Sequence, residues 1–251
     1  IDILEPTDNF SVTQYREAAL EAITNIRARG KQAIFVGGSA LYLKAMLRGI
    51  FDGPPADPEF RSRVEQELKD VPLEALHKRL QQVDPISAQK LHPNDQRRII
   101  RALEVYHSTG EPISHLQNEF ERAHSPDECK VFTLRHPRVV LHQRIQDRVE
   151  WMFQHGLVAE VQQLLERYGD LGKTASQAVG YREVIDHIHG KQDLARTQEL
   201  VLFRTRQFAR HQETWFRGLP ECQMLDIPEH MEGAAMIPWL VESMVSLGQN
   251  H

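Results

Sequence analysis

The stretch Ala33–Leu47, AIFVGGSALYLKAML, decides the fold class. Its first four residues are apolar, Gly37 and Gly38 follow as a turn, and a helical pattern begins at Ser39. A strand, a glycine turn and a helix in this order are typical of a parallel α/β sheet. We therefore predict an α/β fold in which residues 33–36 form a strand of a parallel-sheet core.

The glycine turn has two interpretations. Its backbone N–H groups stand at the start of a helix, where they could hold an anion or polarise a base, and Ser39 would add a hydroxyl. Alternatively, the two glycines only allow the strand to pack tightly against the helix. A second glycine sequence, Gly172-Lys173-Thr174, is not a Walker A loop, because Arg167 stands where that motif has its first glycine.

Outward from this stretch, Ser11 and Gln14 form a capping-box pattern for a helix that is closed by Gly30. Strand character returns at residues 130–134, KVFTL, and at residues 223–227. Helical patterns lie between and after these two segments. The alternation of strands and helices supports the α/β prediction.

The chain changes character at residues 52–58, DGPPADP, which read as a linker. Only helical patterns follow, up to about Pro126. We therefore predict a first part of the α/β core in residues 1–56, an all-helical insertion in 57–126, and the rest of the core with long C-terminal helices in 127–251.

A basic helix stands inside the predicted insertion. His92–Val105 reads HPNDQRRIIRALEV, and at about 100° per residue Arg97, Arg98 and Arg101 share one arc of the helical wheel. A row of planar guanidinium groups suits phosphate oxygens, because each group can hold two oxygens at once. The same pattern also fits a solvated basic face.

A second basic helix is predicted in Asp193–Gly218, which contains no proline and ends at glycine. Arg206, Arg210 and Arg217 fall within about 40° of one another on the wheel. The apolar positions expected on the far side, facing the core, are Val201, Phe208, Trp215 and Phe216. Two such helices favour a polyanionic partner.

Arg144 and Arg148 flank an apolar seam in the segment LHQRIQDRV, residues 141–149. Four residues apart on a helix, they could reach into a cleft and clamp a diphosphate. They could equally pair with Asp147 or Glu150 on their own helix. Spacing alone leaves both interpretations open.

Composition narrows the class of protein. The 251 residues are 41% hydrophobic and 26% charged, which is ordinary for a globular protein. The net charge of −5 means that nucleic acid would bind to local patches, as expected for a selective enzyme. Two distant cysteines exclude a cysteine zinc cluster and a disulfide framework, and no apolar run approaches the ~18 residues of a membrane span.

Six segments occur in an order that carries a family resemblance. They are VGGSALYLKAMLRG (36–49), ADPEFR (56–61), VDPISAQKLHPNDQRRIIRALEVY (83–106), LHQRIQDRV (141–149), QAVGYRE (177–183) and TRQFARHQETWFRG (205–218). Together they closely resemble the tRNA dimethylallyltransferases, also called tRNA isopentenyltransferases. The most specific parts are HPNDQRRIIRALEV and QETWFR.

The resemblance implies a transferase that moves a dimethylallyl group from dimethylallyl diphosphate to N6 of an adenosine beside the anticodon, with Mg²⁺ assisting the diphosphate. It also implies a nucleotide-binding, P-loop NTPase-like core whose helical insertion grips the anticodon stem-loop of tRNA. We expect a cytoplasmic monomer without a membrane segment, and we assign no metal-ligating residues.

By the same resemblance, Ser39 replaces the threonine that the family usually places near the reacting amine, and it is the candidate catalytic and RNA-contacting hydroxyl. Arg144 and Arg148 are the candidates for diphosphate binding. The further tRNA-contacting residues implied by the resemblance are Arg61, Arg97, Arg98, Arg101, Gln177, Gly180, Tyr181, Arg182, Arg210, Gln212, Trp215 and Arg217. The family's basic pair before the glutamine is here Arg210 and His211, and this departure leaves the role of His211 open.

The largest departure from the family pattern concerns its phosphate loop and the aspartate believed to act as general base. Both precede the position that corresponds to Ile1, and neither is found elsewhere in the sequence. We therefore expect these residues to bind an anticodon stem-loop and to transfer dimethylallyl groups at a negligible rate. Two alternatives remain open: a catalytically inactive tRNA-binding remnant, and a P-loop small-molecule kinase.

Overall fold

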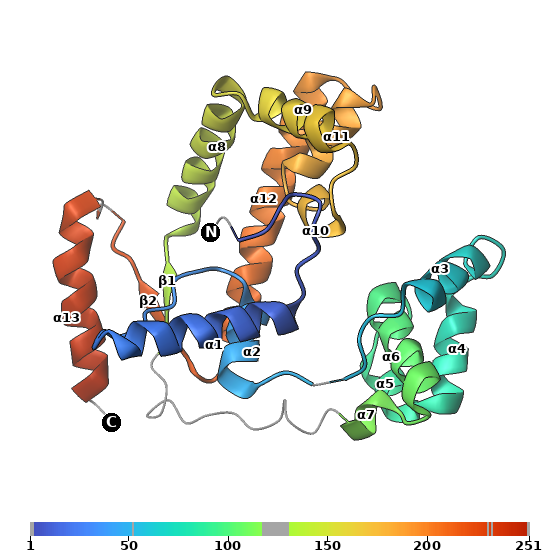
Figure 1. Cartoon of the computed structure of the whole chain (residues 1–251). Helices are drawn as coiled ribbons and strands as arrows, with labels where there is room; N and C mark the ends of the chain where they lie inside the picture. The colour runs from blue at the N-terminus through green and yellow to red at the C-terminus, as the bar shows by residue number, and fades with distance from the viewer. Residues whose placement is uncertain (1–2, 52, 117–130, 230, 232, 250–251) are drawn as a thin grey trace. The chain divides into compact units, whose positions relative to one another are not determined.

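The computed structural model describes residues 3–51, 53–116, 131–229, 231 and 233–249. The elements, in chain order, are α1 (Val12–Ala28), α2 (Ala40–Arg48), α3 (Pro58–Glu67), α4 (Leu73–Val83), α5 (Pro85–Lys90), α6 (Gln96–Thr109), α7 (Ile113–Leu116), β1 (Val131–Arg135), α8 (Arg138–Gln154), α9 (Leu157–Tyr168), α10 (Lys173–Ser176), α11 (Tyr181–Ile188), α12 (Leu194–Arg217), β2 (Cys222–Asp226), η2 (Gly233–Ala235) and α13 (Met236–Gln249) (Figure 1).

The chain divides into two compact units. The first contains residues 1–44 and 124–251, and the second contains residues 45–123. In its described residues the second unit consists of the end of α2 and the helices α3 to α7, joined by turns and loops. It begins inside α2, at residue 45, whereas the sequence suggested a boundary in the proline-rich linker, at residue 57. Its other limit is residue 123, and the expected one was 126.

The first unit is built on a parallel strand pair. β1 and β2 run in register from Val131 opposite Cys222 to Arg135 opposite Asp226. Parallel strands need a crossover connection, and α8 to α12 supply it. The α/β prediction is confirmed at this level, and both strands lie within one residue of their predicted positions.

Two small apolar clusters hold the crossover helices of the first unit together. Ile145 and Val149 of α8 pack against Val201 of α12, so the two longest helices of the crossover lie side by side (Figure 1). A second cluster joins α9 and α11 through Val161 and Val184, both fully buried. Each fully buried aliphatic side chain of this kind contributes about 1.5–3 kcal/mol.

The second unit has its core around α6. Ile99 and Leu103 of this helix are buried against Phe60 of α3 and Leu76 of α4. The helix begins at an N-cap, Asp95, whose carboxylate accepts a hydrogen bond from the Arg98 N–H.

The end of α6 and the start of α1 both follow local sequence signals. Gly110 ends α6 with a positive φ of 74°, which favours glycine. At α1, the capping box predicted from Ser11 and Gln14 is present with both of its hydrogen bonds.

The strand predicted at residues 33–36 is wrong. These residues have no regular secondary structure, and the side chains of Ile34 and Val36 are 86% and 94% exposed. A strand forms only where a neighbour completes its hydrogen-bond ladder, and no strand in the described residues pairs with this segment. The helix predicted after the glycine turn is present as α2.

The core face predicted for α12 is also partly wrong. Val201 and Phe216 are buried as expected, whereas Phe208 is 51% exposed and Trp215 is 40% exposed. The packing of α12 against α8 covers only a narrow stripe of α12. Periodicity identified an apolar side of the helix but not the part of it that has a packing partner.

Among the helices of the described residues, none combines the length and the apolar composition that crossing a bilayer requires.

Candidate functional site

The glycine turn contacts α12 directly. The side-chain Nε2 of Gln212 donates a hydrogen bond to the Gly38 carbonyl at 2.6 Å. A Cβ atom on Gly38 would lie 2.3 Å from this same nitrogen, so the absence of a side chain allows the close approach. Ser39 is exposed beside this contact, and its carbonyl accepts the Leu43 N–H in the first turn of α2. The structure thus brings together Ser39 and Gln212, which are far apart in the sequence.

The segment before α11 is fixed by a buried carboxylate. Gly180 has a φ of 102°, and its N–H donates to Oε2 of Glu183 at 2.8 Å. The other oxygen, Oε1, lies 2.9 Å from Nε of Arg204 on α12. Glu183 is 2% exposed, and a buried carboxylate is stable only when it is paired in this way. The candidate residue Gly180 is therefore held in place by α11 and α12 together.

Tyr181 and Arg182 differ in their surroundings. The hydroxyl of Tyr181 donates to Oε1 of Glu160 on α9, and burial together with this hydrogen bond raises the pKa of Tyr181 to about 12. Arg182 is exposed, as is Gln177. Tyr181 thus has a packing role within the first unit, while Arg182 is accessible from solvent.

The basic side of α12 contains arginines in different states. Arg210 is exposed and has no ion-pair partner among the described residues. Nη2 of Arg217 lies 2.5 Å from Glu213, and Glu213 also lies 3.6 Å from Arg135 at the end of β1. Arg206 is half-buried against Gln146 of α8. The stripe therefore has one fully available cation and two that are engaged.

On α8, Arg144 and Arg148 do not pair with Asp147 or Glu150. Asp147 accepts a hydrogen bond from Gln143 at 2.8 Å, and Glu150 accepts one from Gln146 at 3.0 Å. Both Arg144 and Arg148 are exposed and have no ion-pair partner among the described residues. They remain available to bind an anion.

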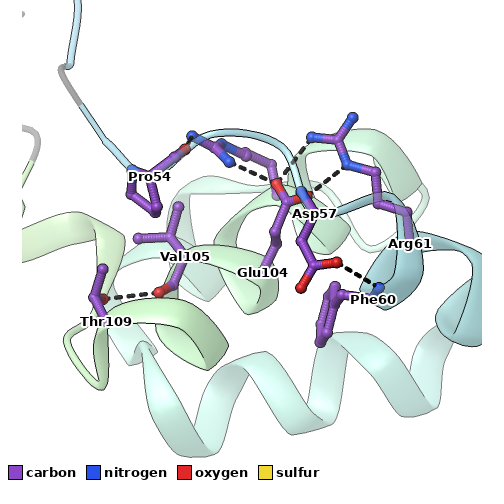
Figure 2. Close-up of polar contacts among 8 residues, drawn as sticks. Pro54, Asp57, Phe60, Arg61, Glu104, Val105 and Thr109 are labelled. Carbon is purple, nitrogen blue, oxygen red and sulfur yellow. Dashed lines mark hydrogen bonds and ion pairs between the residues drawn. The ribbon is translucent and has the colours of Figure 1, made fainter.

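In the second unit, two candidate arginines converge on one buried carboxylate. Glu104 of α6 is completely buried and accepts from Nε of Arg61 at 2.7 Å and from Nη1 of Arg101 at 2.6 Å. It also accepts the Asp57 N–H at 2.8 Å, and Figure 2 shows dashed lines joining its carboxylate to the guanidinium of Arg61. The second amino group of Arg101 donates to the Pro54 carbonyl at 2.8 Å. We call Glu104, Arg61 and Arg101 the Glu104 cluster.

The Glu104 cluster remains charged. Burial alone raises the pKa of Glu104, but the hydrogen bonds from Arg61, Arg101 and the Asp57 N–H outweigh it and lower the pKa below its ordinary value. The hydrogen bond to Glu104 raises the pKa of Arg61. Two of the five N–H donors of each guanidinium group are thus used inside the protein.

Arg97, Arg98 and Arg101, which the helical wheel places on one arc, therefore have different surroundings in the structure. Arg101 is turned toward Glu104 and its side chain is 31% exposed. Arg98 is 65% exposed and lies 3.4 Å from Asp95, the N-cap of its own helix. Arg97 is exposed as well.

Sequence reasoning missed Glu104, Glu183 and Arg135. The spacing of three between Arg101 and Glu104 is a helical pairing signal that was available. The pairing of Glu183 with Arg204 and of Arg135 with Asp226 joins residues from different elements, and no local pattern indicates it.

The described residues do not by themselves account for a magnesium site. They contain no group of three or more His, Cys, Asp or Glu side chains that could hold a metal ion.

Comparisons with known proteins agree with this fold. The sequence model of the IPP transferase family matches residues 1–219. A tRNA dimethylallyltransferase from Rhodopirellula baltica is 50% identical over 245 residues, which cover 98% of this chain and 73% of the relative. The tRNA dimethylallyltransferase 1 of Trichlorobacter lovleyi is 44% identical over 230 residues, which cover 92% and 75%.

Solved structures show the same likeness. The full-length tRNA isopentenylpyrophosphate transferase from Bacillus halodurans has a TM-score of 0.64 at 30% identity, covering 99% of this chain and 78% of that one. A eukaryotic dimethylallyltransferase studied crystallographically while acting on tRNA shares the fold at a TM-score of 0.70 and 24% identity, covering 97% and 64%.

The fold and these matches define a transferase with a small parallel sheet and many helices. The chain belongs to the IPP transferase family.

Proposed function

We infer that this protein transfers a dimethylallyl group from dimethylallyl diphosphate to N6 of an adenosine next to the anticodon of tRNA. The observation that carries this inference is the 50% identity, over 98% of the chain, to a tRNA dimethylallyltransferase. The second observation is the family match over residues 1–219. A small-molecule kinase is disfavoured, because these relatives are prenyl transferases that act on tRNA.

The reaction combines three changes of bonding. The adenine N6 forms a bond to the allylic carbon, the bond from that carbon to the diphosphate oxygen breaks, and N6 loses a proton. The adenine must leave its stack to be reached, as in other enzymes that modify a base. The departing diphosphate gains negative charge, which cations and backbone N–H groups stabilise.

The first unit offers groups that could bind the departing diphosphate and groups that could lie beside the reacting amine. Arg144 and Arg148 are exposed cations without carboxylate partners among the described residues, which supports their role in diphosphate binding. Ser39 is exposed in the glycine turn that Gln212 holds, which supports its role beside the reacting amine. We propose Mg²⁺ as a cofactor held by the diphosphate oxygens rather than by a protein cluster.

We propose that the tRNA is contacted from both units. In the first unit, exposure supports roles for Gln177, Arg182, Arg210, Trp215 and Arg217. In the second, Arg97 and Arg98 are the main candidates, while Arg61 and Arg101 keep only their outward N–H groups for RNA. Gly180 and Tyr181 shape the surface from inside. A P-loop NTPase-like core and a cytoplasmic location complete the proposal.

Arg98 gives the sharpest test of RNA binding by the second unit. Replacing Arg98 by Ala removes about one phosphate contact, so the slope of log K against log salt falls by about one. Arg79 provides a control: it is a half-exposed arginine of α4 paired at 3.9 Å with Glu67. If Arg98→Ala leaves both the affinity and the slope at the values of Arg79→Ala, α6 does not contact RNA.

The activity is tested with labelled dimethylallyl diphosphate and a tRNA that has adenosine beside the anticodon. Label is expected in that tRNA and not in one with guanosine at the same position. Absence of label with both substrates, under conditions where the Rhodopirellula baltica relative is active, contradicts the activity. Label in both tRNAs contradicts the assigned target.

A further inference from the structure

The outer face of α8 has an aromatic part that the roles described so far do not use. Arg144, Arg148, Trp151 and His155 fall within about 60° of one another on the helical wheel, and all four are exposed. We call these four residues the α8 face. Trp151, 58% exposed, is the most exposed aromatic side chain of this helix.

The two rings of the α8 face are already arranged as a stack. The ring centroids of Trp151 and His155 lie 4.3 Å apart with an interplanar angle of 18°. Nδ1 of His155 lies 2.8 Å from the Trp151 carbonyl, which can only accept, so this nitrogen donates a hydrogen. The hydrogen bond fixes the orientation of the imidazole, and the stack therefore loses little conformational freedom when a ligand binds.

One side of this stack is open. Trp151 has no ring partner other than His155 among the described residues. Arg148 lies three residues, or about 4.5 Å along the helix axis, before Trp151. An unpaired cation next to an exposed indole is the combination with which proteins bind single-stranded nucleic acid: the base stacks and the phosphate pairs with the guanidinium.

The arginines of the α8 face are not paired with the neighbouring carboxylates. Asp147 and Glu150 instead accept hydrogen bonds from Gln143 and Gln146, and no ion pair joins them to Arg144 or Arg148 among the described residues. The occupant must therefore combine a flat aromatic group with negative charge. A nucleotide has both, whereas the diphosphate substrate has no aromatic ring.

We propose that the Trp151–His155 stack binds an unpaired base of the tRNA and that Arg148 contacts the phosphate of that nucleotide. The proposal rests on the proposed function, which makes tRNA the substrate. It assigns to α8 a contact with RNA in addition to the diphosphate role of its arginines. The base meets the open face of Trp151 and lengthens the stack by one ring.

The test compares tRNA affinities at one salt concentration. Replacing Trp151 by Ala is expected to weaken binding about 5- to 150-fold, the range for loss of one base–aromatic stack, without changing the salt slope. Trp151→Phe keeps a ring and is expected to restore most of the affinity. Val139→Ala is the matched control, because Val139 is an apolar residue of α8 that is 78% exposed on the other side of the helix.

A second ligand separates a base contact from a general loss of structure. A single-stranded RNA should bind Trp151→Ala more weakly than wild type, and a fully paired duplex should bind both equally, because its bases are not accessible. The KM for dimethylallyl diphosphate should not change in Trp151→Ala. If Trp151→Ala lowers the unfolding temperature, Trp151→Leu replaces it in the same comparison.

The outcomes distinguish this inference from the proposed function. If wild type binds no tRNA, the proposed function fails. If wild type binds tRNA and Trp151→Ala binds within twofold of wild type, the function stands and the stacking contact is overturned. Equal weakening by Trp151→Phe and Trp151→Ala, or equal loss of duplex binding, also overturns it.

Discussion

The buried carboxylate of Glu104 lies 2.6 Å from the guanidinium of Arg101, three residues earlier on the same helix. The same carboxylate binds Arg61 of α3 and the backbone N–H of Asp57. Through these bonds α6 fixes both α3 and the segment that leads into it (Figure 2). A row of arginines that the sequence presents as one basic face is therefore partly a structural element of the second unit.

Arg101→Ala is expected to destabilise the second unit by about 1.5–3 kcal/mol, the range for a hydrogen bond to a charged group, because Arg61 still pairs with Glu104. Arg98→Ala is the matched control: its ion pair with Asp95 is exposed, and such pairs contribute about 0–1 kcal/mol. Urea unfolding of both variants measures the difference. Equal unfolding free energies would mean that the Glu104 cluster does not stabilise the fold.

The free energy of unfolding of the second unit is expected to decrease at acid pH, because Glu104 becomes protonated. Its pKa is lowered in the folded state, so the stabilisation is present above the ordinary carboxyl pKa of about 4.3 and is lost as pH falls through the folded value. Asp84, whose pKa is also lowered because hydrogen bonds from Ser87 and Ser114 outweigh its burial, acts in the same direction.

The unfolding temperature measured between pH 7 and pH 3 checks this dependence. In Glu104→Gln, part of the acid-induced loss should disappear, and the variant should be less stable than wild type at pH 7. A pH profile parallel to that of wild type would exclude Glu104 as a source of the dependence.

Gly38→Ala is expected to lower the rate of dimethylallyl transfer, because the new Cβ would displace the side chain of Gln212. Gly37→Ala is the control, since a Cβ there meets nothing within 4 Å. If the effect acts through Gln212, Gly38→Ala should cost much less in a Gln212→Ala background than in wild type. Additive effects in this double-mutant cycle would show that the two residues are not coupled.

Replacing two adjacent residues of α12 by Ala should have different main effects, one on stability and the other on tRNA binding. Phe216 is 9% exposed and its replacement by Ala is expected to cost about 3–5 kcal/mol of stability. Trp215 is 40% exposed, so Trp215→Ala should cost at most about 1–2 kcal/mol and should instead weaken tRNA binding. Thermal unfolding and tRNA titration of the two variants decide this, and the reverse order would contradict the assignment of Trp215 to the RNA surface.

The starts and ends of helices were predictable because their signals are local. Ser11, Gln14 and Gly30 act through hydrogen bonds and backbone angles within a few residues of themselves. The predicted strand at residues 33–36 failed for the opposite reason. Its apolar composition was correct for a strand, but strand formation depends on a neighbouring strand that the segment itself does not contain.

In the candidate site, too, local features were predictable from the sequence, whereas contacts between elements were not. The sequence selected Arg144 and Arg148 but left open whether they pair on their own helix, and in the structure Asp147 and Glu150 bind glutamines instead. The helical wheel selected Arg101, and the family resemblance Arg61, as cations for RNA, whereas both bind Glu104. A helical wheel gives the direction of a side chain but not what lies opposite it.

The sequence by itself determined the α/β class, the helix limits set by capping residues, and the family, because each of these depends on local order or on motifs in a fixed succession. Only the tertiary structure decided which charges are available. Burial of Glu104 and Glu183 makes each recruit an arginine from another element, since an unpaired carboxylate in the interior is too unstable. That choice depends on which helices pack together, which no short stretch of sequence specifies.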